Sequence, residues 1–227
     1  MIRISHPLRL DSPLYPGTPR PEVVPFRSLE RGDSSSSSLI TVHSHSGTHL
    51  DVPRHFCPGG ASVADICVDE LVLEPALCLD LPRTGDQQIR PADIAACACD
   101  LRSVHALLIR TGEGSTRATD RARYSTVHPW LDPGVAAFLR EECPSLHLFG
   151  IDTISVSSPA HREEGHACHR AFLCRSPPIL LLEDLDLTST MLPGHGWRLR
   201  IIPWVLAPVD GVPVTAFLEE AGGSPAH

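Results

Sequence analysis

A histidine-rich stretch from His43 to Phe56, reading HSHSGTHLDVPRHF, constrains this chain more than any other segment. Four histidines and one aspartate fall within thirteen positions. The preceding residues 39–42 (LITV) are aliphatic or β-branched, which predicts that the chain enters as a strand. Gly47 permits a sharp turn, and Pro53 prevents a helix from running through. We therefore predict a strand and turn, and not the helix that carries two histidines in HExxH metalloproteases.

An extended chain would place several of these side chains together. Residues two apart in a strand point the same way, so His49 and Asp51 share a face. His55 can follow on that face, and His45 can close the set from across the turn. Imidazoles and a carboxylate with one open position are typical of a catalytic site for zinc or a similar divalent metal. Asp51 has two oxygens and could bridge a second ion, whereas His43 is expected to be only a strand residue.

The run from His45 to His55 resembles the HxGTHxDxPxH signature of the metal-dependent cyclase family, which includes bacterial kynurenine formamidase (arylformamidase) and isatin hydrolase. Seven defined positions match without a gap. Further segments resemble the family along nearly the whole chain: Leu14–Pro19 (LYPGTP), Leu107–Gly112 (LLIRTG), Gly150–Val156 (GIDTISV), His169–Leu173 (HRAFL) and Glu183–Leu187 (EDLDL).

The resemblance implies one or two divalent metal ions and a histidine acid/base. Zinc is the preferred metal and manganese the alternative. Carried over by position, one ion would be bound by His45, His49 and Asp51, the second by Asp51, His169 and Glu183, with His55 as the acid/base and Tyr15 in the substrate pocket. The spacing from His169 to Glu183 is two residues longer than is usual in the family, which makes His166 a rival ligand. Ser157 stands where the family run ends in aspartate, and Tyr15 where tryptophan is common.

The implied fold is α/β, a swivelling β/β/α architecture around a mixed, partly closed sheet, and we expect residues 1–227 to form a single domain. The implied activity is hydrolysis of a small amide by metal-bound hydroxide, as in an arylformamidase that converts N-formylkynurenine to kynurenine and formate. A histidine at position 55 can accept and return a proton near neutral pH. A cyclic amide or lactone hydrolase and a non-catalytic metal-binding module remain as alternatives, since a shared fold does not fix the substrate. The resemblance also implies at least a homodimer.

Composition excludes other classes of partner. The formal charge is −8 without a basic block, so nucleic acid is not an expected partner. No apolar run approaches the length of a membrane span. The opening MIRISHPLRLD lacks the apolar centre of a signal peptide, which predicts a cytoplasmic location.

The eight cysteines show no CxxC spacing and agree with a reducing compartment. Most are expected to be core thiols. Cys57, Cys168 and Cys174 lie close in sequence to proposed site residues, and we predict that they are small filler residues and not nucleophiles. Cys97 and Cys99 form a CxC pair that lacks the further ligands of a metal site.

Alternating apolar segments predict a mixed α/β order. Helices are expected over residues 90–99 and 132–142, the first with Pro91 in its first turn. A short helix is expected from residue 62, and a long loop or lid over 113–130. The proline-rich arm, residues 11–25, is expected to form a pocket wall, residues 34–38 a flexible turn, and residues 221–227 a frayed tail. Strands are expected at 2–10, 76–81, 104–110, 146–151, 179–182, 199–205 and 214–218.

Overall fold

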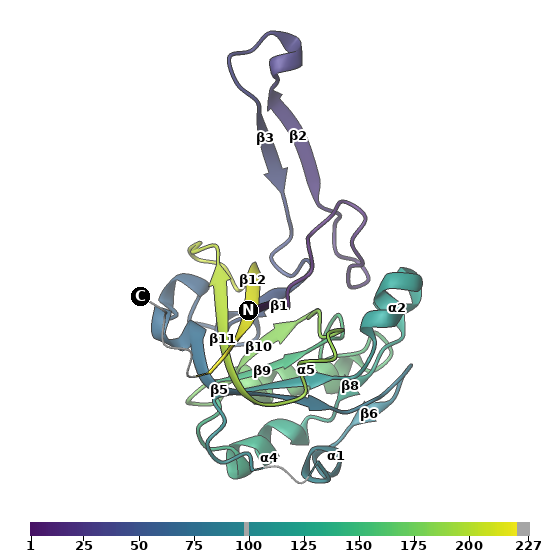
Figure 1. The fold of residues 1–227 in the computed structure, drawn as a ribbon, viewed down its shortest axis with the longest axis vertical. Helices are drawn as coiled ribbons and strands as arrows, with labels where there is room; N and C mark the ends of the chain where they lie inside the picture. The colour runs from purple at the N-terminus through teal and green to yellow at the C-terminus, as the bar shows by residue number, and fades with distance from the viewer. Residues whose placement is uncertain (98–99, 222–227) are drawn as a thin grey trace.

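A closed, mostly β barrel with helices on one side forms the body of the molecule in the computed structural model, which describes residues 1–97 and 100–221 (Figure 1). Its main sheet runs in the order β1-β12-β11-β5-β7-β9-β10-β4, and β12 also pairs with β4, which closes the sheet on itself. The strands of this sheet are β1 (Ile2–Arg3), β4 (His49–Asp51), β5 (Val72–Asp80), β7 (Ala106–Arg110), β9 (Leu148–Ile151), β10 (Leu180–Glu183), β11 (Gly194–Pro203) and β12 (Gly211–Glu220). The predicted mixed, partly closed α/β sheet is therefore confirmed.

Strand direction divides the barrel into two halves. β5, β7, β9 and β10 are parallel, and the remaining pairings are antiparallel. Parallel neighbours need crossover connections, which here carry the helices. The helices are α1 (Pro91–Ala95), α2 (Gly114–Thr119), α3 (Arg121–Thr126), α4 (Gly134–Glu142) and α5 (Arg162–Leu173). A short parallel pair, β6 (Gln88–Ile89) with β8 (Trp130–Leu131), lies beside them.

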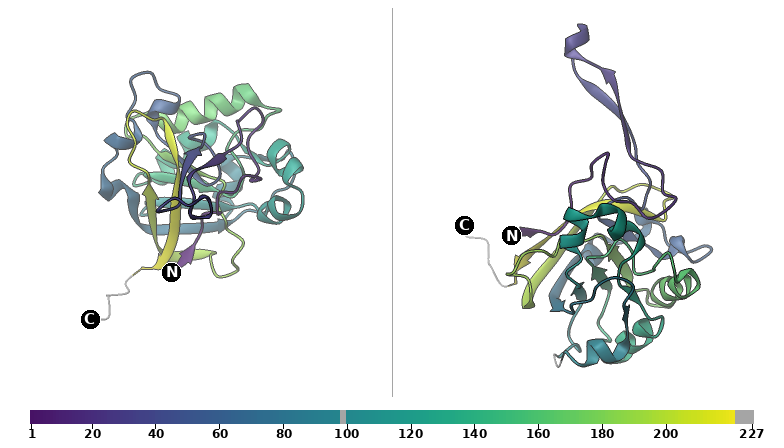
Figure 2. Two further views of the ribbon diagram at one scale, coloured as in Figure 1. Left: turned by 90° about the horizontal axis from the view of Figure 1, so that it is seen from above. Right: turned by 90° about the vertical axis from the view of Figure 1, so that its right-hand side faces the viewer.

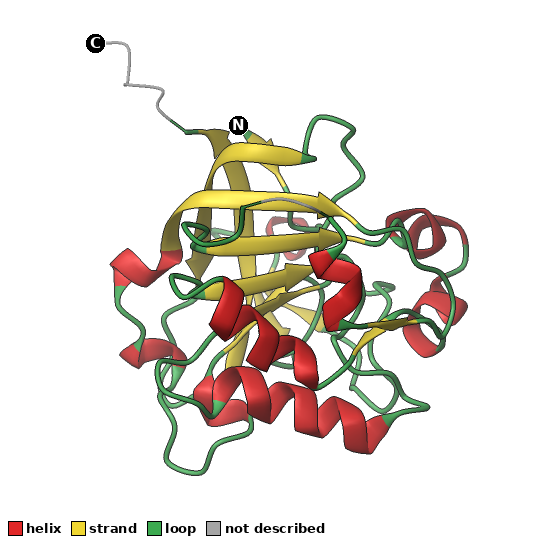
Figure 3. Ribbon diagram, turned by 90° about the horizontal axis from the view of Figure 1, so that it is seen from below, coloured by secondary structure: helices red, strands yellow, loops and turns green. Residues whose placement is uncertain are grey.

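Alternation along the parallel strands separates two cores. Leu108 of β7 points into the barrel, where it belongs to one buried cluster with residues of β11 and β12. Its neighbours Leu107 and Ile109 point outward, where Leu139 of α4 and Phe172 of α5 cover them. Figure 3 shows these helices along one side of the strands. The parallel strands are thus buried on both faces, which explains their uninterrupted apolar sequences.

Three short 3₁₀ turns lie between β4 and β5: η2 (Pro53–His55), η3 (Val63–Asp65) and η4 (Val68–Leu71). A fourth, η1 (Leu29–Arg31), lies between β2 and β3. The predicted helix from residue 62 is therefore only a pair of single turns. The helices predicted over 90–99 and 132–142 are confirmed as α1 and α4, although both are shorter. Cys99 of the CxC pair and residues 222–227 of the predicted tail lie outside the described residues.

The prediction of a loop or lid over residues 113–130 is wrong, because this segment forms α2 and α3. Asp120 accepts a hydrogen bond from the Arg123 backbone nitrogen at 3.0 Å and so caps α3. The segment is also anchored to the body. Arg117 pairs with buried Asp184 at 2.7 Å, and the Tyr124 hydroxyl lies 2.7 Å from the same carboxylate. The polar sequence of this segment resembles that of a loop, but these buried polar contacts hold it in place.

A two-stranded hairpin, β2 (Glu22–Arg27) with β3 (Ser37–Thr41), projects from the body (Figures 1 and 2). All residues of both strands are exposed. The predicted turn at 34–38 lies at the hairpin tip and passes into β3 at Ser37. Among the described residues, no helix is both long and apolar enough to cross a bilayer.

Candidate metal and catalytic site

The histidine-rich stretch forms a strand and a turn, as its sequence predicts. β4 places His49 and Asp51 on one side, and Nε2 of His49 lies 3.3 Å from Oδ1 of Asp51. Gly47 adopts a φ of 64°, in the left-handed region that favours glycine. The turn at Gly47 folds His45 back against β4, so that Nδ1 of His45 lies 2.7 Å from the same Asp51 oxygen.

Residues far along the chain complete the group. In the antiparallel pairing of β10 with β4, Glu183 lies opposite His49, and its Oε2 is 3.3 Å from Nε2 of His49. α5 contributes His169, whose Nε2 lies 3.6 Å from Oε1 of Glu183 and 3.7 Å from Oδ2 of Asp51. The structure therefore brings together all five residues that the resemblance implied as ligands. They come from β4, the turn before it, β10 and α5.

Backbone carbonyls orient two of the imidazoles. Nδ1 of His49 donates to the Gly47 carbonyl at 2.8 Å, and Nδ1 of His169 donates to the Gly165 carbonyl at 2.8 Å. A carbonyl can only accept, so each Nδ1 carries a proton and each Nε2 faces the carboxylates. Metal-binding histidines commonly have this arrangement, because the carbonyl fixes both the tautomer and the ring orientation.

Glu183 is held in place by the loop after β9. Its Oε1 accepts hydrogen bonds from the Val156 backbone nitrogen at 2.7 Å and from the Ser155 hydroxyl at 3.1 Å. Ser157, which replaces the expected aspartate, is also buried, with its hydroxyl 3.3 Å from that of Ser155. A neutral side chain therefore occupies this part of the wall.

Burial and charge strongly perturb the group. Burial acts to lower the pKa of His45, but the Asp51 and Asp210 carboxylates outweigh it and raise that pKa to about 9. Burial and the nearby Asp51 both act to raise the pKa of Glu183, yet the contacts from His169 and His49 lower it to about 2. The pKa of Asp51 also falls well below its usual range, because His45 and His49 outweigh its burial. Without a metal, the buried carboxylates are thus neutralised by protons on the histidines.

The residues fit a divalent cation on two observations. Oδ2 of Asp51 is buried without a hydrogen-bond partner in the structure, an arrangement that proteins seldom leave uncompensated. The ligand atoms of His45, His49 and Asp51 lie within 4.8 Å of one another, and Nε2 of His169 lies within 3.7 Å of both Asp51 and Glu183. Imidazole nitrogens and carboxylate oxygens suit zinc and manganese alike.

Asp210, in the loop before β12, is a site residue that sequence reasoning missed. Its Oδ2 lies 2.9 Å from Nε2 of His45 and 3.0 Å from Nδ1 of His55. Gly211 follows it, and a Cβ there would come within 2.6 Å of the His45 ring. The only sequence signal is an Asp-Gly pair before a closing strand, which is equally typical of an ordinary turn.

A cavity of about 210 Å³ opens over this group. Tyr15 lies in its wall, so the proline-rich arm does form a pocket wall. Phe56 stacks on His169, with 4.5 Å between ring centroids. His166 lines the cavity and packs against Phe56, but it is His169 that contacts the carboxylates. His43 is exposed, lies beyond the end of β3 and also lines the cavity.

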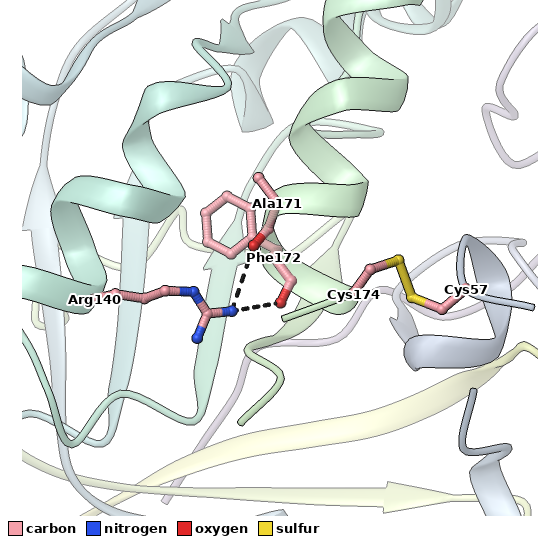
Figure 4. The surroundings of a disulfide bond; sticks show 5 residues. All are labelled: Cys57, Arg140, Ala171, Phe172 and Cys174. Carbon is pink, nitrogen blue, oxygen red and sulfur yellow. Dashed lines mark hydrogen bonds between the residues drawn. A yellow bond between two sulfur atoms is a disulfide. The ribbon is translucent and has the colours of Figure 1, made fainter. Parts of the chain in front are cut away.

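The prediction that Cys57 and Cys174 are filler residues is wrong, because they form a disulfide (Figure 4). Cys57 lies two residues beyond His55, and Cys174 caps the end of α5, the helix that carries His169. Sequence reasoning missed the pair because 117 positions separate its members, and only the packing of α5 brings them together. Cys168 is a buried thiol, as predicted.

Comparisons with known proteins agree with this architecture. The sequence profile of the family described as "Putative cyclase" matches residues 2–158. The chain is 32% identical over 222 residues to the kynurenine formamidase of Geobacillus thermodenitrificans (strain NG80-2), covering 97% of this chain and 98% of the relative. It is 31% identical over 221 residues to that of Bacillus mycoides (strain KBAB4), covering 96% of each.

Among solved structures, isatin hydrolase A from Labrenzia aggregata bound to benzyl benzoate superposes with a TM-score of 0.77. Its sequence identity to this chain is 22%, with coverage of 96% of this chain and 92% of that one. At this identity the likeness supports the fold.

Proposed function

Because the chain belongs to the cyclase family, we propose that it is a metal-dependent hydrolase of a small amide, most similar in activity to an arylformamidase. The observation that carries the proposal is the convergence of three histidines on two carboxylates, one of which, Asp51, keeps an oxygen without a hydrogen bond within the described residues. These groups come from separate elements, and four of them, His49, Asp51, His169 and Glu183, are buried, although burying ionisable groups is costly unless they are paired or bind a metal.

We assign the metal ligands in two sets that share Asp51. His45 and His49 would bind the first ion with Asp51, and His169 and Glu183 the second, with zinc preferred and manganese as the alternative. A bound divalent ion polarises a carbonyl and lowers the pKa of water towards about 7. This choice of His169 over His166 follows from its contacts with both carboxylates.

His55 is positioned to move the proton. Its Nδ1 lies 3.0 Å from the Asp210 carboxylate, which orients the ring and leaves Nε2 as the nitrogen free for proton transfer. His55 would accept a proton from the attacking water and return it to the leaving amine nitrogen. The products of a formamide would then be an amine and formate.

The cavity wall supports an aromatic substrate. Tyr15 and Phe56 line it, and aromatic side chains favour the flat faces of aryl rings. Hydrolysis of a cyclic amide, the reaction of isatin hydrolase, is the second candidate, and the shared fold supports it. A non-catalytic metal module would need a closing protein ligand. Within the described residues, no candidate ligand group includes His43 or a cysteine.

Metal analysis combined with a formanilide assay tests the proposal. Zinc- or manganese-loaded protein should hydrolyse formanilide, and Asp51→Asn should lose both bound metal and turnover. The exposed Asp69→Asn is the matched control and should retain both. His55→Ala should keep its metal but lose about a hundredfold or more of kcat, the usual contribution of a general acid/base. Full turnover in either site variant would contradict the proposal.

The exposed hairpin supports a homodimer. Phe26 is 61% exposed, and Leu39 and Ile40 are each 59% exposed. An isolated two-stranded hairpin is only marginally stable in water, and exposed apolar surface of this kind commonly marks an interface. We therefore assign the hairpin to contacts with a second copy of the chain.

The expectation that the cysteines fit a reducing compartment is not supported, because Cys57 and Cys174 are paired. The cytoplasmic location that we propose therefore does not rest on the cysteines. Disulfides in the cytosol of mesophiles are rare and usually transient. Thiol counting in rapidly quenched lysates tests whether the pair is oxidised in the cell.

A further inference from the structure

α5 presents a polar stripe to the cavity. Arg162, His166 and His169 follow one another at positions i, i+4 and i+7, and all three line the cavity. Residues at this spacing share one face of a helix. Exposure decreases along the stripe, since Arg162 is exposed, His166 half-buried and His169 buried. The stripe therefore leads from the cavity mouth to the proposed metal site.

Arg162 lines the cavity and has no carboxylate partner among residues 1–97 and 100–221, unlike the arginines that form ion pairs elsewhere. Arg117 pairs with Asp184, and Arg198 with Glu74. Glu163 and Glu164 are exposed and follow Arg162 directly, but neither lines the cavity.

Among the described residues of the wall, none offers Arg162 a competing anion at the mouth. Ile154 and Ser157 are neutral, as is Thr18 of the arm. Glu183 is the one carboxylate in the described lining, and it lies buried between His49 and His169. A cation therefore faces the entrance of a cavity whose acidic group is already neutralised.

We propose that Arg162 is a specificity-determining residue that binds a carboxylate of the substrate, with His166 as a second hydrogen-bond donor. The inference rests on the proposed function and assigns to Arg162 the recognition of a carboxylate on the side chain of an aryl formamide. Guanidinium groups suit this task because their donors match the two carboxylate oxygens. Arg162 and His169 are seven positions apart on α5, a rise of roughly 10 Å along the helix axis. The carboxylate should therefore lie towards the cavity mouth, with the scissile amide at the inner end.

This arrangement separates two classes of substrate. A linear formamide with a carboxylate on a flexible side chain can reach both Arg162 and the metal ligands. A compact neutral cyclic amide carries no carboxylate, so it would gain nothing from Arg162. The enzyme should accordingly prefer the acidic linear substrate.

A matched pair of substrates tests the inference. One is a formanilide with a carboxylate on a short alkyl side chain, and the other is its neutral methyl amide. Arg162→Gln should lower kcat/KM for the acid about tenfold, mainly through KM, and should change it less than about twofold for the amide. Arg162→Lys should recover part of the loss. Arg170→Gln is the control, because Arg170 is exposed on the same helix and does not line the cavity.

The outcomes distinguish a failure of the proposed hydrolase function from a failure of the role assigned to Arg162. If the wild-type metal-loaded enzyme hydrolyses neither substrate, the proposed function fails. If it hydrolyses both and Arg162→Gln affects them equally or not at all, the role of Arg162 is refuted while the hydrolase assignment stands. A loss confined to the acidic substrate supports the inference.

Discussion

Replacing Cys57 with serine should lower the free energy of unfolding by up to about 5 kcal/mol. The disulfide to Cys174 closes a loop of 117 residues, and the loop-closure entropy of an unfolded chain of that length corresponds to about 5 kcal/mol at 25 °C. This is an upper value, because measured losses commonly fall below the entropic one. Arg140 also holds the end of α5, donating to the Phe172 carbonyl at 2.9 Å, and so limits local opening in the variant (Figure 4).

Urea unfolding with a metal-free sample measures this effect directly. Cys174→Ser should match Cys57→Ser, and the double variant should lose no more than either one, since both remove a single bond. A reductant should destabilise the wild type to a similar extent and leave the variants unchanged. Cys67→Ser is the control, because Cys67 is an exposed free thiol, and its effect should stay within about 0.5 kcal/mol.

The prediction extends from stability to the site. Cys57 lies close to His55, and Cys174 follows the helix that carries His169, so the bond ties the two sides of the cavity together. Its loss should weaken metal binding, which titration with zinc would measure. Two free thiols at Cys57 and Cys174 in the native wild type, or variants as stable as the wild type, would refute the reasoning.

Three further predictions concern the site and the hairpin. Asp210→Asn should lower kcat about tenfold or more while retaining metal, because it removes the carboxylate that orients His55; unchanged kcat with normal metal content would argue against that role. Metal affinity should rise with pH towards about 9, because binding must displace the proton that Asp51 and Asp210 hold on His45 despite its burial. Calorimetry in two buffers of different ionisation enthalpy counts the protons released, and a count of zero at pH 7 would contradict the prediction. Phe26→Ser together with Leu39→Ser should shift the protein towards monomer in analytical ultracentrifugation, and an unchanged sedimentation profile would remove the hairpin from the interface.

Local sequence determined the centre of the site. Gly47 and Pro53 restrict the backbone strongly enough to exclude a helix, and the two-residue period of a strand then places His49 and Asp51 on one side. The uninterrupted apolar runs before Arg110 and Glu183 likewise predicted buried strands, and in the structure both strands lie in the parallel half of the barrel. These features depend on neighbours in the chain, so the sequence carries them directly.

The tertiary structure decided which distant groups meet. Barrel closure between β12 and β4 brings Asp210 to His45 and His55, although about 160 positions separate them. The packing of α5 selects His169 over His166 for contact with the carboxylates. The same packing pairs Cys57 with Cys174.

The conformation of residues 113–130 also depends on tertiary contacts. Their polar composition resembles a loop, but buried contacts to Asp184 hold them as two helices. Contacts of this kind depend on how strands and helices pack in three dimensions. Spacing along the chain does not encode them in any local pattern.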